Sequence, residues 1–214
     1  MHLYLYDLVE GSCRQLTSGK WVVRAIEHWD ERQRLLYFSA AGRERPGVVD
    51  PYLRHLYSIP VDEPNALPTL LTPEPADHAI KFSPNGQWFT DSYSRADLPT
   101  VAVLRDAADG RVLLRLEAAD LKPLLAVGWK MPQPFVTTAP DGVTQLYSLF
   151  WPPHQPGGNE NDGIINNETE HPAGSVPVLE NIYTGPHSVS DKCSSWKYKV
   201  KIFSGFHNQC HCSM

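Results

Sequence analysis

Several features that would place a protein in a class at once are missing from this sequence. It has no apolar run of about 18 residues, so we expect no transmembrane span. Its 24 Asp and Glu outnumber its 19 Lys and Arg, for a formal net charge of −5. That balance argues against a nucleic-acid partner and against recruitment by anionic lipid. The N-terminal Met-His-Leu-Tyr-Leu-Tyr also lacks the basic and long apolar regions of a signal peptide. These observations leave the cellular compartment open.

Cysteine is scarce. The chain has four, at positions 13, 193, 210 and 212, too few in 214 residues for a disulfide framework. The segment 207–212 holds two His and two Cys, which are zinc-ligand types, but one short loop cannot wrap a tetrahedral ion. We therefore predict no metal site and no cofactor.

Proline and aromatic residues, in contrast, are abundant. There are 19 Pro, 6 Trp, 9 Tyr and 7 Phe. Proline interrupts helices, and aromatic residues favour the half-buried surface of a pleated sheet. The composition therefore predicts short strands and many turns.

The first 151 residues are typical of β-structure throughout. Apolar or alternating runs predict strands over 3–8, 13–17, 21–26, 35–40, 55–61, 78–82, 88–94, 100–105, 112–116, 134–139 and 144–150. Gly-containing pairs such as Asn85-Gly86 mark tight turns. A polar turn is expected over 28–34. The single helix candidate before residue 152 is a short turn within 116–125, with Asp120 as a possible cap.

An internal repeat suggests how these strands are organised. Gln15-Leu16-Thr17 and Leu70-Leu71-Thr72 lie 55 residues apart, each at the end of a strand-rich unit. Leu3-Tyr4-Leu5-Tyr6 and His55-Leu56-Tyr57-Ser58 hold the matching earlier place. Four-stranded units of about this period are typical of propeller blades. We favour an all-β fold, a partial β-propeller, over the alternative of a β-sandwich with long loops.

The composition changes after residue 151. Residues 152–175 are rich in Gly, Asn, Glu and Pro and predict a linker. Val176 to Tyr183 is typical of a buried strand and ends at a Thr-Gly-Pro turn. Residues 189–214 show no clear period and remain unassigned.

At this level of detail residues 2–151 resemble the last part of the propeller domain of dipeptidyl peptidase IV-like serine peptidases, in the prolyl oligopeptidase family. The resemblance lies in the order and spacing of several short motifs rather than in one diagnostic motif. They include His2 to Leu8, Gln15 to Gly19, Leu36 to Ala40, His55 to Tyr57, His78 to Gly86, Asp91 to Arg95, Leu104 to Asp106, Ala139 to Gly142, and Leu146-Tyr147.

The strand from Val178 to Tyr183 with its Thr-Gly-Pro turn resembles the first strand of that family's α/β-hydrolase domain. The resemblance assigns residues 176–188 to the start of such a domain. The resemblance implies that Tyr183 would donate its hydroxyl to the oxyanion hole, a role that suits a neutral donor in a water-excluded site. Thr184 departs from the Ala or Gly that is usual there.

The family's other catalytic groups have no counterpart here. No Gly-x-Ser-x-Gly nucleophile motif occurs, and 31 residues follow Tyr183, too few for a hydrolase sheet. His78, Asp91 and Ser92 are close in sequence, but they fall in strands and turns, and we do not expect a triad from them.

The resemblance implies a fragment of a serine exopeptidase that releases N-terminal X-Pro or X-Ala dipeptides, in which this chain lacks the catalytic Ser, Asp and His and is inactive alone. It implies peptide substrates, and full-length relatives that are homodimers. The alternative is a non-catalytic β-propeller module that binds a partner. The genomic sequence past residue 188, read in all three frames, would discriminate between the two.

Overall fold

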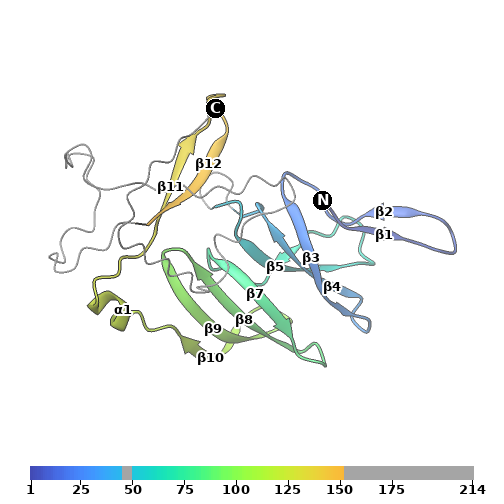
Figure 1. Ribbon diagram of the computed structural model, residues 1–214. Coiled ribbons are helices and arrows are strands. Elements are labelled where there is room, and N and C mark those ends of the chain that lie inside the picture. Colours follow the sequence, from blue (N-terminus) through green and yellow to red (C-terminus); the bar gives the residue numbers. More distant parts are fainter. Residues whose placement is uncertain (45–49, 152–214) are drawn as a thin grey trace.

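The computed structural model describes residues 1–44 and 50–151, and within them it is almost entirely β-structure. Figure 1 shows three units in succession across the molecule: a hairpin, a four-stranded sheet and a second four-stranded sheet. Another hairpin stands apart from them at the top of this view. The prediction of an all-β fold built from four-stranded antiparallel units is confirmed.

The first unit is a hairpin of β1 (Tyr4–Tyr6) and β2 (Cys13–Gln15), in which Tyr4 pairs with Gln15. Asp7 closes its turn, because its Oδ1 accepts hydrogen bonds from the backbone N–H groups of Val9 (2.8 Å) and Glu10 (3.0 Å). This is an Asx turn, in which the Asp side chain accepts hydrogen bonds from backbone N–H groups a few residues later.

The second unit is an antiparallel sheet in simple sequential order. Its strands are β3 (Val22–Asp30), β4 (Leu35–Ala41), β5 (Arg54–Pro60) and β6 (Thr69–Leu70). The polar turn expected over 28–34 is wrong in its first half, because β3 continues to Asp30. The cause is a tertiary contact, in which the ring of His28 stacks on Phe82 of the next sheet at 4.8 Å.

The third unit repeats the same order. Its strands are β7 (Asp77–Phe82), β8 (Trp88–Arg95), β9 (Leu98–Asp106) and β10 (Val112–Ala118). The helix candidate is confirmed in kind but lies further along, as the five-residue α1 (Lys122–Ala126). Asp120 precedes it and accepts a hydrogen bond from the backbone N–H of Lys122 at 2.9 Å.

The last described unit is a hairpin of β11 (Gln133–Thr138) and β12 (Gln145–Phe150), turned by Asp141-Gly142. Tyr147 of this hairpin meets Tyr52 edge-on, with ring centroids 5.9 Å apart. No helix in the described ranges is long and apolar enough to cross a membrane.

The core forms on both faces of the sheet β3–β6. On one face Val23, Phe38, Tyr57 and Ile59 are buried against residues of the β1–β2 hairpin and its flanks. The other face packs on the sheet β7–β10, and its cluster consists of Tyr37, Leu56, Leu71, Phe89 and Ala107. Because neighbouring residues of a strand point to opposite faces and both faces are covered, the central positions of β4 and β5 are all buried.

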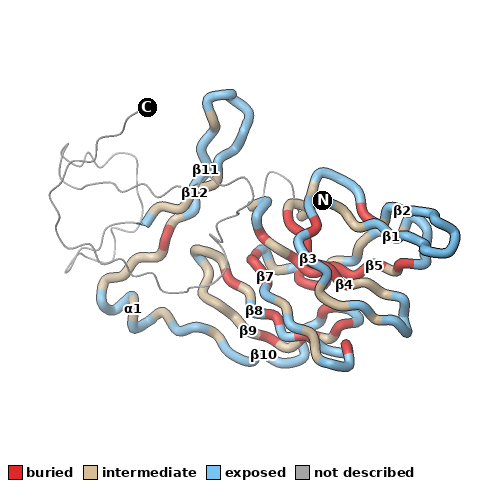
Figure 2. Tube along the Cα trace, turned by 45° about the vertical axis from the view of Figure 1, so that its right-hand side comes forward, coloured by how far each residue is buried: buried red, intermediate tan, exposed pale blue. Residues whose placement is uncertain are grey.

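Figure 2 shows the consequence for burial. Buried residues concentrate in β4, β5 and the strands β7–β9 that face them, whereas β10 is mostly exposed. Consecutive four-stranded sheets packed face to face are the arrangement of propeller blades. The predicted linker 152–175, the hydrolase strand in 176–188 with Tyr183, and the tail 189–214 all lie outside the described residues.

Candidate functional site: a buried ion cluster in the second sheet

A cluster of charged side chains is buried where the sheet β7–β10 meets β3–β6. Arg105 of β9 is 2% exposed and Asp91 of β8 is fully buried. Arg105 Nε donates to Asp91 Oδ2 at 2.8 Å, and its Nη2 donates to Glu74 Oε2 at 2.7 Å. Its Nη1 donates to the carbonyl oxygen of Gly110 at 2.9 Å. Each nitrogen of the guanidinium therefore has an acceptor, as a buried charge requires.

His78 of β7 completes the cluster. Its Nδ1 lies 2.9 Å from Asp91 Oδ1, and its Nε2 lies 3.0 Å from the carbonyl oxygen of Glu74. Both contacts are to oxygen acceptors, so the imidazolium form, which donates from both nitrogens, satisfies them together. Asp91 is thus held between two groups that can each carry positive charge.

The electrostatics of the cluster follow from competition between burial and pairing. Burial alone raises the pKa of Glu74, but the hydrogen bond and charge of Arg105 outweigh it and hold that pKa below its ordinary value. For Arg105 burial lowers the pKa, and the hydrogen bond to Glu74 with the charge of Asp91 turns the net shift upward. Both groups therefore keep their charges at neutral pH.

Glu74, His78 and Asp91 are also residue types that ligate metals, and their ligand atoms lie within 4.8 Å of one another. In this chain a guanidinium already bonds both carboxylates, and both nitrogens of His78 are engaged. The groups that would ligate a metal are thus already bonded within the cluster. The arrangement fits a structural ion cluster better than a metal centre.

The cluster also fixes a close approach of two backbones. Gly110 has φ +76°, and a Cβ at this position would lie 2.1 Å from the carbonyl oxygen of Leu71. Only glycine fits such a turn without strain. The turn between β9 and β10 therefore rests directly on the end of the preceding sheet.

A second buried histidine lies beside the cluster. The ring of His55 in β5 is 5.2 Å from that of His78, and the residue is 3% exposed. Its Nδ1 lies 2.7 Å from the carbonyl oxygen of Thr72 and must donate to it, while its buried Nε2 has no partner among the described residues. Burial lowers the pKa of His55.

A surface pocket of about 410 Å³ opens between the β1–β2 hairpin and the sheet β3–β6. Its one Arg, Arg43, lies over the ring of Tyr57 at 5.0 Å and over Trp21 at 5.9 Å. The side chain of Glu44 is 3.6 Å from this guanidinium and accepts a hydrogen bond from the Tyr57 hydroxyl. The charge of Arg43 is therefore already balanced by its neighbours.

The structure brings together two of the three residues considered for a triad. His78 and Asp91 are bonded, whereas Ser92 follows Asp91 on a strand, points to the opposite face and is exposed. Arg105 and Glu74 were missed by the sequence reasoning. The available signal was one Arg within the apolar run 101–105, which pairs with β8.

Known proteins share sequence and fold with this chain. Residues 1–100 match the family described as "Dipeptidyl peptidase IV (DPP IV) N-terminal region". The chain is 26% identical over 207 residues to the probable dipeptidyl peptidase 4 of Arthroderma benhamiae, across 95% of this chain and 24% of that protein. The dipeptidyl peptidase 4 of Arthroderma otae is 32% identical over 98 residues, 46% of this chain and 12% of that protein.

Among solved structures, the crystal structure of Porphyromonas gingivalis dipeptidyl peptidase 4 superposes with a TM-score of 0.58 at 24% identity. The match covers 72% of this chain and 20% of that one. This likeness supports the fold. The chain spans about a quarter of the length of the first curated relatives that it matches.

Proposed function

Because the chain is a dipeptidyl peptidase IV-like fragment whose residues 1–100 match the N-terminal region of that family, we propose that it supplies part of the β-propeller of a serine exopeptidase. The whole enzyme would release X-Pro or X-Ala dipeptides from peptide N-termini. The observation that carries this proposal is the pair of consecutive four-stranded sheets, β3–β6 and β7–β10, packed face to face.

In this role the described residues shape and support the propeller and take no part in the chemical reaction. The cluster of Arg105, Asp91, Glu74 and His78 ties three strands of one blade together, and Gly110 sets that blade against the end of the one before it. A rigid contact between blades would fix the rim of a propeller that limits access of peptides to the active site.

The domain organisation is part of the proposal. Residues 1–151 form the partial propeller, 152–175 the linker, 176–188 the start of the α/β-hydrolase domain, and 189–214 an unassigned tail. Tyr183 would lie at the end of the first hydrolase strand and donate to the oxyanion hole. The full-length enzyme would act on peptides as a homodimer.

The first test is an activity measurement on the 214-residue chain. We expect no hydrolysis of a Gly-Pro chromogenic substrate, because a triad acts as a unit and no Gly-x-Ser-x-Gly motif is present. Turnover above a boiled control would contradict this. A binding module would be inactive as well, so the second test separates a peptidase fragment from such a module.

The second test separates them. The genomic sequence beyond the codon for residue 188 is read in all three frames. A Gly-x-Ser-x-Gly motif followed by Asp and His supports the peptidase. If the triad is found, Tyr183→Phe in the full-length protein should lower kcat by about 10²-fold, with Tyr147→Phe as the control. Absence of the motif would favour a non-catalytic propeller module.

A further inference from the structure

A second pocket, of about 300 Å³, lies between the two four-stranded sheets at the end where their turns gather. It is lined by residues around the β3–β4 turn, the β7–β8 turn and the start of the β9–β10 turn. Its volume is at the lower end of the range for small-ligand sites. The buried ion cluster does not contribute to its lining.

The charge in this pocket is negative. Asp30 and Asp106 both line it, and no Lys, Arg or His of residues 1–44 and 50–151 does. Asp106 is shared with Arg111, whose Nη2 donates to its Oδ2 at 2.9 Å. Asp30 accepts the backbone N–H of Gln33 at 3.0 Å and forms an ion pair with no cation among residues 1–44 and 50–151. One carboxylate charge is therefore uncompensated.

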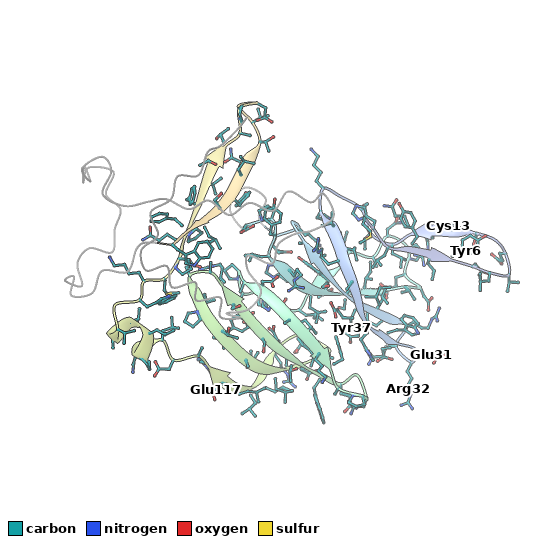
Figure 3. The ribbon with its side chains drawn as sticks, viewed as in Figure 1. Tyr6, Cys13, Glu31, Arg32, Tyr37 and Glu117 are labelled. Atoms are coloured by element: carbon teal, nitrogen blue, oxygen red, sulfur yellow. The ribbon has the colours of Figure 1, made fainter. Side chains whose placement is uncertain are left out.

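A largely buried tyrosine side chain also borders this pocket. Tyr37, labelled in Figure 3, lines the pocket and is 2% exposed. The centroid of its ring lies 5.9 Å from that of His28 and 4.9 Å from that of Phe82. Its hydroxyl makes no hydrogen bond to the part of the chain that the structure describes. Burial raises the pKa of Tyr37, and the charges of Asp30 and Asp106 raise it further.

We propose that this pocket binds an alkylammonium or guanidinium group, carried either by a free amine or by a Lys or Arg side chain of a peptide. The uncompensated carboxylate of Asp30 supplies the opposite charge, and the Tyr37 hydroxyl supplies an acceptor for an N–H donor. Trp88, which also lines the pocket and is 45% exposed, offers an aromatic face to the cation.

Other ligand classes fit less well. An anion would meet two carboxylates without a balancing charge on the pocket wall. A divalent metal needs several ligand atoms that converge, and Asp30 and Asp106 belong to no such set among the described residues. The proposal is independent of the peptidase assignment, because it rests on the pocket alone.

The test is calorimetric titration of the 214-residue chain at low ionic strength. The probes are n-butylammonium, n-butylguanidinium and N-acetyl-lysine methylamide, with n-butanol as the neutral control. We expect saturable binding of the cations and none of butanol. Equal affinity for butylammonium and the lysine derivative would mean that the headgroup suffices, and binding of the lysine derivative alone would assign the site to peptides.

Two variants make the result specific. Asp30→Asn should weaken binding about tenfold, because it removes the charge from a charge-assisted hydrogen bond. Tyr37→Phe removes a hydroxyl that has no hydrogen-bond partner among the described residues, so the variant should fold normally and still bind more weakly. Asp120→Asn is the matched control, since Asp120 is an exposed carboxylate outside the pocket that also accepts a nearby backbone N–H, and it should leave the affinity unchanged.

The proposal is overturned if none of the cations binds saturably, or if butanol binds as well as butylammonium. It is also overturned if Ca²⁺ alone saturates the site and excludes the amines. Unchanged affinity in both Asp30→Asn and Tyr37→Phe, with circular dichroism like that of the parent chain, would equally reject it.

Discussion

Thr17 and Thr72 occupy equivalent positions, each two residues after the second strand of its hairpin, β1–β2 and β5–β6. The hydroxyl of Thr17 accepts a hydrogen bond from the backbone N–H of Leu3 at 2.9 Å, and that of Thr72 accepts one from Leu56 at 2.8 Å. Both threonines are buried. The 55-residue repeat in the sequence thus corresponds to a repeated hydrogen bond that closes the outer hairpin of each unit.

Thr72→Val tests this bond. The change keeps the shape of the side chain but leaves the buried N–H of Leu56 without an acceptor, which should cost about 1–3 kcal/mol in the free energy of unfolding. Urea denaturation measures that loss, and hydrogen exchange should show faster exchange at Leu56. The control is Thr90→Val, whose exposed hydroxyl lies 3.4 Å from its acceptor, where little change is expected. Equal effects of the two variants would contradict the assignment.

Arg105→Met should destabilise the chain by about 3–5 kcal/mol, because it leaves the carboxylate of Asp91 buried without its guanidinium. Arg34 offers a matched comparison, since it forms a bidentate ion pair with Asp62 at the surface. Arg34→Met should change stability little. Thermal denaturation compares the two.

A double variant shows whether the loss of stability in Arg105→Met comes from the unpaired charge of Asp91. Asp91→Asn introduced together with Arg105→Met removes the unpaired charge and should regain part of the lost stability. If the double variant is no more stable than Arg105→Met alone, the loss does not come from a stranded charge.

Gly110→Ala should be more damaging than Gly142→Ala, although both glycines have similar positive φ, +76° and +73°. A Cβ at Gly142 meets nothing within 4 Å, so only the backbone strain of about 1–2 kcal/mol applies. At Gly110 the Cβ would also strike the Leu71 carbonyl, and two sheets would have to separate. The difference between their denaturation midpoints measures this close approach; similar midpoints would mean that the turn can move away.

Acidification should destabilise the fold through His55. Burial lowers its folded-state pKa below the ordinary value of 6.5, so the unfolded chain binds the proton more readily. This contribution is complete above pH 6.5 and is lost progressively as the pH falls below it. His55→Gln should therefore flatten the fall in stability between about pH 6.5 and 5, as measured by urea denaturation at each pH. An unchanged slope would show that His55 is not responsible.

The strands were predictable from the sequence because alternation and turn residues are local signals. The pairs Asn85-Gly86, Asp109-Gly110 and Asp141-Gly142 all fall in turns between paired strands. The prediction was wrong where a contact distant in sequence determines the structure. His28 was expected in a turn but lies in β3, because its ring stacks on Phe82 of another sheet.

The repeat was found in the right place but one residue out of register at its start. Gln15 pairs with Tyr4 and Leu70 pairs with Tyr57, so Tyr4 corresponds to Tyr57 rather than to Leu56. The ion cluster could not be predicted, since its one local signal, an Arg within an apolar run, is shared by the buried Arg105 of β9 and the exposed Arg115 of β10. Only the packing of two sheets distinguishes them.

The ion cluster has a consequence for how the chain can fold. All of its members fall within residues 74–110, and every strand pair of the two sheets joins neighbours in sequence. Contacts of such short range form early, before distant segments meet. Arg105 can therefore find Asp91 while the hairpins of its own blade assemble in water, and only the later docking of the preceding sheet removes them from solvent. Because the ion pair forms before it is buried, no unpaired charge has to enter the core. If the partner of Arg105 came from a distant blade, one of the two charges would be buried unpaired first, at a high cost in free energy.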